Sequence, residues 1–297
     1  MTTNEETKKW NVLETFEKFS VDQEKAKEEF RNYEDSTRQS IVEWHYREMR
    51  TNQTFAFVDR MFKKWHSFDK AEMTIREAFE KLESYVDSSD PDCDFPNLEH
   101  NLQTAIGIRE AGHPEWFQLV GLLHDMGKIM FALGGLEKDG QHGHQYSPQW
   151  ALGGDTWVVG AKIPDTVVFP EMNRLNGDYD NESYNTKFGV YKPGCGFENL
   201  RFAYGHDEYM YQMLKFNKCA IPEEGLAMIR YHSCYPWHSK NEYDHFMSEK
   251  DHYLKKWVQE FNQFDLYTKS DKRPDVKKEW PYWQKLIDKY CPGMLRW

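Results

Sequence analysis

The chain has 297 residues, of which 39% are hydrophobic, 29% are charged and 16% are aromatic, and its formal net charge is −11 at pH 7. This composition is typical of a globular protein with a sizeable core. An acidic chain without a basic cluster is not expected to bind nucleic acid or an anionic membrane surface.

The predicted elements are almost all helices. Residues 1–28 are charged and polar, and we predict a loosely ordered amino-terminal segment there. From residue 29 to 297 we find no repeat and no break in composition, so we predict one catalytic domain over 29–297. Helical spacing of apolar side chains predicts helices over Ser36–Phe68 with an interruption at Thr51-Asn52, Met73–Val86, Leu98–Ala111, Glu115–Leu133, His206–Asn217, Pro222–Ser233 and His252–Tyr267.

Other segments carry weaker signals. Residues 134–205 are irregular, and WVVGA and TVVF within them are either small strands or buried loop. No stretch approaches the roughly 18 apolar residues of a membrane span, and the amino terminus lacks the apolar run of a signal peptide. The five scattered cysteines contain no Cys-x-x-Cys pair. We therefore expect a cytoplasmic protein without a disulfide framework or a thiolate zinc site.

The stretch 116–131, WFQLVGLLHDMGKIMF, is the strongest local signal. Its apolar side chains cover every direction of a helix, which indicates that the helix is buried. His124, Asp125 and Lys128 lie within it, and a buried carboxylate or ammonium group is costly unless it is paired or bound to metal. One interpretation is a buried Asp125–Lys128 ion pair beside a hydrogen-bonded histidine, and the other is a metal site.

In each of three more predicted helices, a side chain of a kind that can bind a metal ion lies on the apolar face. These side chains are His206, His232 and Asp265. A single core histidine is usually just hydrogen-bonded, but four such positions in one chain favour a shared partner, and metal ions are the simplest one. On these helices Glu208, Lys215 and Arg230 are predicted to point away from that face.

The remaining histidines give weaker evidence for a metal site. His100 lies opposite the apolar face of its helix, so periodicity alone predicts that it is exposed. His142 and His144 fall in a Gly-rich loop, where we expect exposure to solvent. A structural or surface role is predicted for the others, which lack clustered partners: His45, His66, His113, His238, His245 and His252.

The order of these residues along the chain resembles that of the myo-inositol oxygenases. The resemblance covers nearly the whole length from FRNYEDS onward, and its supporting stretches include SDPDCDFPN, LVGLLHDMGK, GDTWVVG, GHDEYMYQMLKFNK, YHSCYPWH, VQEFNQFDLYTKSDKRPDV and LIDKYCPG. It implies a mainly α, single-domain helical HD-type fold around a dinuclear metal site. It also implies the reaction, which is cleavage of the myo-inositol ring by O2 to give D-glucuronate. The cofactor would be two iron ions in a mixed Fe(II)/Fe(III) state, with no organic cofactor.

The resemblance also implies roles for individual residues. His100, His124, Asp125 and Asp265 would hold one iron, and His206 and His232 would hold the other, with Asp125 bridging both. Asp125 and Lys128 would be catalytic, since Lys128 is placed to bond or deprotonate the substrate oxygen. The residues implied to bind substrate are Arg31, Asp87, Ser88, Ser89, Lys128, Gly154, Asp155, His232, Ser233 and Lys269.

Two other functions are weighed against this one. An HD-type metal-dependent phosphohydrolase would use the same ligands to activate water, but it needs Arg or Lys residues to grip phosphate, whereas these polar loops are rich in Asp, Ser and Gly. A non-catalytic binding or scaffold protein would leave the buried Asp125 and Lys128 without purpose. The segment 134–153 is longer than the resemblance predicts and precedes Gly154 and Asp155. We expect a monomer acting on a small molecule.

Overall fold

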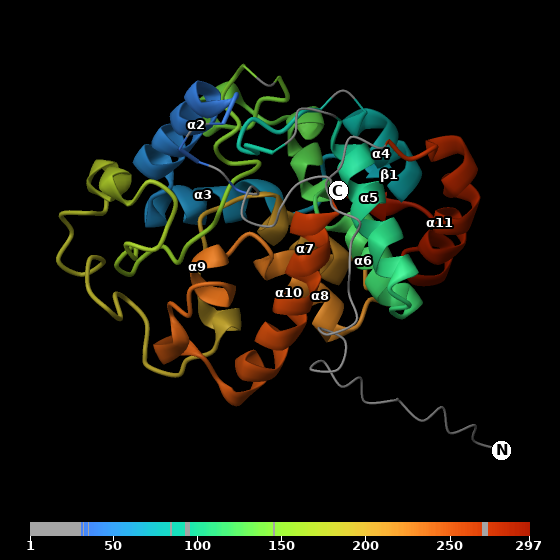
Figure 1. Cartoon of the computed structure of the whole chain (residues 1–297). Coiled ribbons are helices and arrows are strands. Elements are labelled where there is room, and N and C mark those ends of the chain that lie inside the picture. Colours follow the sequence, from blue (N-terminus) through green and yellow to red (C-terminus); the bar gives the residue numbers. More distant parts are fainter. Residues whose placement is uncertain are drawn as a thin grey trace.

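The computed structural model describes residues 31, 33–34, 36–83, 85–92, 96–144, 146–268 and 273–297. The predicted amino-terminal segment 1–28 and Lys269 lie outside these residues. Within them the prediction of a mainly helical fold is confirmed (Figure 1). The α-helices are α2 Gln39–Asn52, α3 Phe55–Trp65, α4 Ile75–Leu82, α5 Asn97–Glu110, α6 Glu115–Leu123, α7 His206–Phe216, α8 Glu223–Tyr231, α9 Tyr235–His238, α10 Glu249–Tyr267 and α11 Val276–Tyr290.

Short elements complete the described secondary structure. The 3-10 helices are η2 Met126–Leu133, η3 Glu137–Asp139, η4 Pro170–Leu175, η5 Phe197–Asn199 and η6 Asp244–Phe246. The strands β1 Glu72–Met73 and β2 Leu295–Arg296 pair antiparallel, with Met73 opposite Leu295. This pairing brings the carboxyl end of the chain to the start of α4. The described residues contain no helix that is long and apolar enough to cross a membrane.

The centre of the molecule is a group of packed helices. Helix α5 packs on α6, α7 packs on α8, and α10 crosses α8, as the middle of Figure 1 shows. Buried hydrophobic side chains form one cluster that extends from Val42 in α2 to Trp297 at the carboxyl end. A shared core of this kind supports the predicted single domain, which remains a prediction.

Two predicted helices are broken in the structure. The first ends at Asn52, within the predicted interruption, and the buried side-chain amide of the next residue, Gln53, donates to the carbonyls of Trp150 and Tyr204. Thr54 then caps α3 by accepting a hydrogen bond from the backbone N–H of Phe57. The second, predicted over Glu115–Leu133, ends as an α-helix at Leu123 and resumes as the 3-10 helix η2.

Helix α11 was not predicted from the sequence. Its residues Val276–Tyr290 include several lysines and an internal proline, Pro281, which obscure the apolar face that packs against α6. Proline inside a helix removes one backbone hydrogen bond and lowers any helical expectation. Trp283 and Leu286 are buried on that face.

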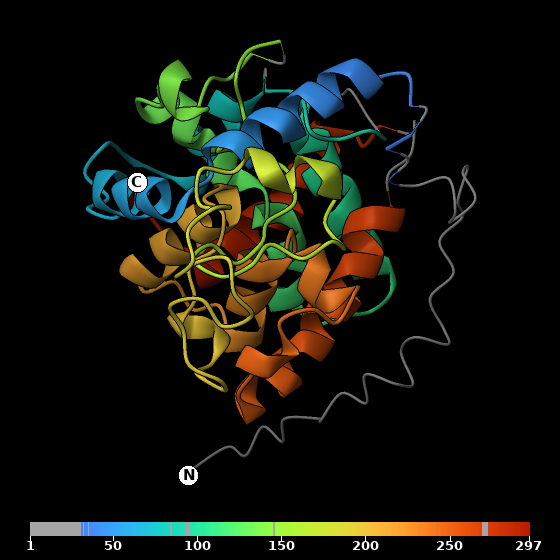
Figure 2. The ribbon, with the colours of Figure 1, turned by 90° about the vertical axis from the view of Figure 1, so that its left-hand side faces the viewer.

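The segment between η2 and α7 covers one side of the helices. Figure 1 shows it as green and yellow loops on the side away from α11, and Figure 2 brings these loops toward the viewer. Of the two apolar pieces predicted here as strand or buried loop, WVVGA provides one isolated bridge between Val158 and Phe202. This segment matters to function because Gly153, Gly154 and Asp155 lie in it.

Candidate metal centre

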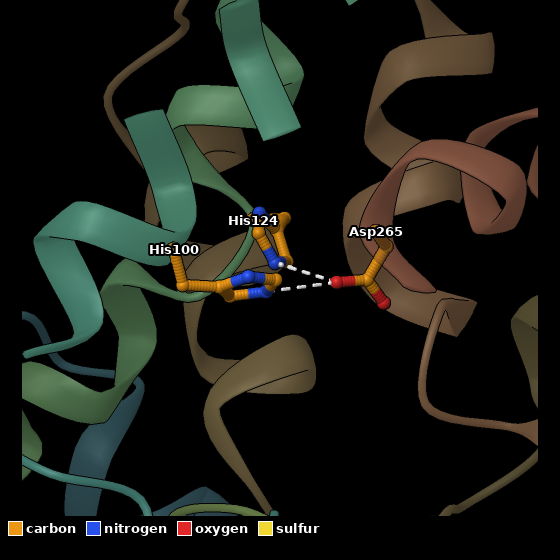
Figure 3. A group of neighbouring side chains, drawn as sticks. All are labelled: His100, His124 and Asp265. Carbon is orange, nitrogen blue, oxygen red and sulfur yellow. Dashed lines mark hydrogen bonds and ion pairs between the residues drawn. The ribbon is translucent and has the colours of Figure 1, made fainter. Parts of the chain in front are cut away.

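The first group of possible metal ligands comes from three helices that are far from one another in the sequence. His100 comes from α5, His124 ends α6 and Asp265 lies near the end of α10. His100 Nε2 lies 3.0 Å and His124 Nε2 lies 3.3 Å from the same oxygen, Asp265 Oδ1. Figure 3 shows both imidazoles pointing at this carboxylate. All three side chains are buried, so the group is shielded from bulk water.

Asp125 joins this group to a second one. Its Oδ2 lies 3.7 Å from His124 Nε2, whereas its Oδ1 lies 2.9 Å from His206 Nε2 and 3.7 Å from His232 Nε2. His206 begins α7, and His232 follows the last residue of α8. One carboxylate therefore stands between two sets of histidines, with an oxygen facing each set.

Close backbone packing makes this convergence possible. At Gly121 in α6, a Cβ atom would lie 3.0 Å from Ala105 Cα of α5, so only glycine allows these two helices to approach so closely. At Gly127, a Cβ atom would overlap the backbone carbonyl of His206. Because α6 ends at Leu123 and η2 begins at Met126, His124 and Asp125 lie between these two elements, beside α7. Both small residues thus bring the ligand-bearing segments together.

The histidine tautomers fit a cation. His124, His206 and His232 each hold Nδ1 against a backbone carbonyl, at 2.8, 2.6 and 2.9 Å respectively. A carbonyl only accepts, so Nδ1 carries the proton and Nε2 presents a lone pair in the neutral ring. His206 Nε2 and His232 Nε2 lie 3.0 Å apart. Two lone pairs that close repel unless a proton or a metal ion lies between them.

A different carboxylate also lies near these histidines. Asp207 forms a buried group with His206 and His232 that has the spacing of metal ligands. Asp207 Oδ1, however, lies 3.3 Å from His206 Nδ1, and that nitrogen already donates to the carbonyl of Leu152. Asp125 is the carboxylate that faces the Nε2 atoms, so we place it, and not Asp207, among the candidate ligands.

The electrostatics keep both central carboxylates ionised. Burial alone would raise the pKa of Asp125, but the Lys128 ammonium beside it holds it well below its usual value. Burial likewise opposes ionisation of Asp265, yet its hydrogen bond with His100 lowers its pKa well below the usual range. The site is therefore a buried concentration of negative charge and nitrogen lone pairs, which suits iron and other transition metals.

Lys128 links the metal-ligand group to the neighbouring cavity. Its Nζ lies 2.7 Å from Asp125 Oδ2 and 2.7 Å from Asp87 Oδ2, and it donates to Asn97 Oδ1 at 3.1 Å. Burial favours the neutral amine, but the two carboxylates outweigh it and raise the pKa of Lys128 above its usual value. Lys128 is therefore an ammonium group that donates hydrogen bonds at neutral pH.

A polar cavity of about 670 Å³, including the space at its mouth, opens beside these groups. The residues that line it are Arg31, Tyr33, Tyr46, Asp87, Ser89, Asp90, Pro91, Asp92, Asn97, His100, Asp125, Lys128, Gly154, Asp155, His206, His232, Ser233, Tyr235 and Asp265.

Most residues implied by the resemblance to bind substrate meet in this cavity. The exceptions are Ser88, which is fully buried beneath it with its Oγ 2.9 Å from His45 Nδ1, and Lys269, which lies outside the described residues. Several of the lining residues were not predicted from the sequence. Nothing in their periodicity marks them, because they lie in loops or carry hydroxyl and amide groups common at surfaces: Tyr33, Tyr46, Asp90, Asp92, Asn97 and Tyr235.

Arg31 forms part of the cavity wall. Its guanidinium binds both oxygens of Asp155, at 3.1 and 2.5 Å, and stacks 3.5 Å from the centre of the Tyr235 ring. Its backbone N–H donates to Asp92 at 3.1 Å. Tyr46 adds a hydrogen bond from its hydroxyl to Asp155 Oδ1 at 3.2 Å. The amino-terminal end of the described chain is thus tied across the cavity to the loop that carries Asp155.

One expectation from periodicity was wrong. His100 is buried, because the second face of α5 also turns inward with Gln103 and Thr104. Glu208 and Arg230, which were predicted only to point away from the faces of His206 and His232, form a buried ion pair with Arg230 Nε 2.7 Å from Glu208 Oε2. By contrast, the predicted exposure of His142 and His144 is confirmed.

Comparison with known proteins gives one consistent match. Residues 39–297 match the family described as myo-inositol oxygenase. Inositol oxygenase of Danio rerio is 49% identical over 278 residues, which cover 92% of this chain and 95% of that protein. The Mus musculus protein of the same name is 49% identical over 276 residues, and the Homo sapiens protein is 46% identical over 282 residues, covering 92% and 94% of those proteins. By sequence match over nearly its whole length, this chain belongs to the myo-inositol oxygenase family.

Proposed function

We propose that this chain uses two iron ions to cleave the ring of myo-inositol with O2, giving D-glucuronate and water. Membership of the family supports the activity and the substrate. The observation that carries the metal assignment is Asp125, whose two oxygens face separate groups of histidines. A bridging carboxylate needs this arrangement.

The proposed ligand sets follow the two groups. His100, His124 and Asp265 would hold one iron, His206 and His232 would hold the other, and Asp125 would bridge them. Three Nε2 lone pairs, fixed by Nδ1–carbonyl hydrogen bonds, support this assignment. A mixed Fe(II)/Fe(III) state is part of the proposal. The bound iron ions would supply redox chemistry with O2 and Lewis acidity toward a substrate hydroxyl.

The cavity lining matches a polyol. Lys128 offers a charged donor, and Asp87 and Asp155 offer carboxylate acceptors, which suits a ring with a hydroxyl on every carbon. We propose that the Lys128 ammonium binds the reacting hydroxyl oxygen and stabilises negative charge that develops on it. Ser89 and Ser233 would complete the orientation of the ring. Arg31, Gly154 and His232 also line the cavity, whereas Ser88 would act from beneath it.

Exclusion of water is a further part of the proposal. Arg31, its partner Asp155 and the ring of Tyr235 form a wall that would separate bound substrate from solvent. Substrate entry would then require this ion pair to open. The role proposed for Lys269, the monomeric state and the cytoplasmic location rest on the resemblance and on composition.

The cavity disfavours the phosphohydrolase alternative. Its two cationic side chains among the described residues, Arg31 and Lys128, are both already paired with carboxylates. Asp90 and Asp92 add more negative charge to the lining. Apart from bound metal ions, the described lining therefore offers a phosphate dianion only cations that are already paired, whereas a neutral polyol needs no cation.

The test is oxygen uptake by iron-loaded protein on addition of myo-inositol, with glucuronate assayed in the same sample. We expect equimolar O2 consumption and glucuronate formation. Phosphoesters would be screened in parallel with the same protein. Hydrolysis of a phosphoester, with no O2 uptake from protein shown to hold two irons, would overturn the proposal.

A further inference from the structure

We infer that His45 is a positioning residue for substrate binding, which holds two cavity loops at a set distance through its two ring nitrogens. One loop contains Ser88, between Asp87 and Ser89, and the other contains Gly153, before Gly154 and Asp155. This inference rests on the proposed function, because it takes the bound molecule to be myo-inositol. His45 itself is not part of the cavity lining.

His45 connects the two loops through one hydrogen bond at each ring nitrogen, and we call this side chain a brace for that reason. Its Nδ1 lies 2.9 Å from Ser88 Oγ, and its Nε2 lies 3.2 Å from the carbonyl oxygen of Gly153. His45 is 1% exposed, and it lies in α2, which belongs to neither loop. A rigid helix therefore supports both loops through one side chain.

The proton positions on the ring follow from its partners. The Gly153 carbonyl only accepts, so Nε2 must carry a proton. Burial lowers the pKa of His45, although the charge of Asp87 opposes the shift, and the ring is therefore neutral with a single N–H. Nδ1 then accepts from the Ser88 hydroxyl. Each nitrogen is committed to one loop, and neither can exchange its role.

The two loops carry facing parts of the proposed substrate site. Asp87 contacts Lys128 and accepts hydrogen bonds from the backbone N–H and hydroxyl of Ser89, at 2.7 and 2.6 Å. On the other loop Asp155 pairs with Arg31. Because His45 connects the two loops, it sets the separation between the Asp87 and Asp155 carboxylates.

The loops also pack directly on each other and on the imidazole. A Cβ atom at Gly153 would lie 2.7 Å from Asp87 Oδ2, and one at Gly154 would lie 3.0 Å from His45 Nε2. Gly154 has a φ of +96°, so its own conformation also favours glycine. The backbone of Gly154 therefore rests on the imidazole, and removal of the ring would take away the support that holds this loop in place.

The experiment measures inositol binding separately from turnover. Iron-loaded wild-type protein, His45→Ala, His45→Asn and His45→Gln would be compared by anaerobic equilibrium dialysis with radiolabelled myo-inositol, and by O2 uptake for KM and kcat. Asn keeps an acceptor near the Nδ1 position, and Gln keeps a donor near the Nε2 position. We expect Ala to raise the dissociation constant and KM about tenfold, the loss corresponding to one or two buried hydrogen bonds. Asn and Gln should each give a smaller rise, and kcat should change less than KM.

Matched controls separate positioning from stability. His66→Ala removes a partly buried histidine, one that contacts Tyr204 away from the cavity, and it should lower the unfolding temperature without changing inositol binding. All His45 variants should retain two irons. If His45→Ala does not fold, the comparison is read from His45→Asn and His45→Gln, which preserve most of the volume.

The outcomes distinguish this inference from the proposed function. Wild-type dissociation constant and KM in folded His45 variants would overturn the inference while leaving the oxygenase intact. Loss of iron from these variants would also overturn it, because His45 would then act on the metal centre. A wild-type protein with two irons that neither binds myo-inositol nor consumes O2 would instead remove the proposed function.

Discussion

Glu208 and Arg230 form a buried ion pair that joins the helix of His206 to the helix of His232. Arg230 Nε lies 2.7 Å and Arg230 Nη2 lies 3.3 Å from the two carboxylate oxygens. Each member stands two residues from a histidine of the second ligand group, in α7 or in α8. The pair therefore restrains the two helices whose histidine Nε2 atoms lie 3.0 Å apart.

Replacement of Glu208 by Gln should destabilise the protein and weaken this half of the metal centre. The guanidinium would remain buried without a negative partner, which costs about 3–5 kcal/mol in comparable pairs. Thermal unfolding measures the first effect, and iron content per chain at limiting iron measures the second. Arg60, which is largely exposed beside Asp139, offers a control, since Arg60→Gln should change neither quantity much. Unaltered stability in Glu208→Gln would show that the pair restrains nothing.

Asp125→Asn should lose iron or turnover. A carboxylate between two cations supplies negative charge to both, and an amide of the same shape does not. Metal analysis of the purified variant, with circular dichroism to confirm the fold, measures the effect. Asp207→Asn is the matched control, because Asp207 also lies beside His206 but faces its Nδ1 atom. If Asp207→Asn loses iron and Asp125→Asn keeps it, the two aspartates have been assigned the wrong way round.

Lys128→Ala should keep two irons and lose most of its turnover. The lysine is proposed to bind the reacting hydroxyl, and removal of a charged donor from such a position typically costs about a hundredfold or more in kcat. Iron content and O2 uptake on the same sample separate the two properties. Loss of iron from a folded Lys128→Ala protein would place the lysine in support of the metal ligands and not of the substrate.

The stability of the protein should fall on mild acidification through His66. Burial lowers the pKa of His66 from 6.5 to about 4. The unfolded state therefore binds a proton below about pH 6.5 that the folded state refuses until about pH 4, so stability is lost as the pH falls through this window. Between pH 7 and pH 5 the loss from this one group is about 2 kcal/mol.

The measurement is the free energy of unfolding at both pH values for wild type and His66→Gln. Glutamine does not titrate, so the variant should lose about 2 kcal/mol less than wild type over this interval. His142→Gln removes an exposed histidine and should behave like wild type. Parallel losses in wild type and His66→Gln would show that the ring is already hydrated or protonated in the folded protein.

Much of the candidate site could be predicted from the sequence alone. A buried carboxylate and ammonium within WFQLVGLLHDMGKIMF, and His206, His232 and Asp265 on apolar faces, mark positions where a polar group must have a partner. That conclusion needs only the cost of burying charge and the periodicity of a helix. The helical class follows from the same periodicity, and the structure confirms it.

The tertiary structure determines which polar groups meet, and helical periodicity cannot predict this. The hydrophobic pattern identifies one face of a helix, but it does not say which polar group another element brings to the opposite face. His100 meets Asp265 across 165 residues of sequence, and Glu208 meets Arg230 from the next helix. His45, which had no notable context in the sequence, braces two loops that lie far apart along the chain. Burial is favourable for each of these polar groups only because its partner arrives through long-range packing, and that packing exists only in the folded chain.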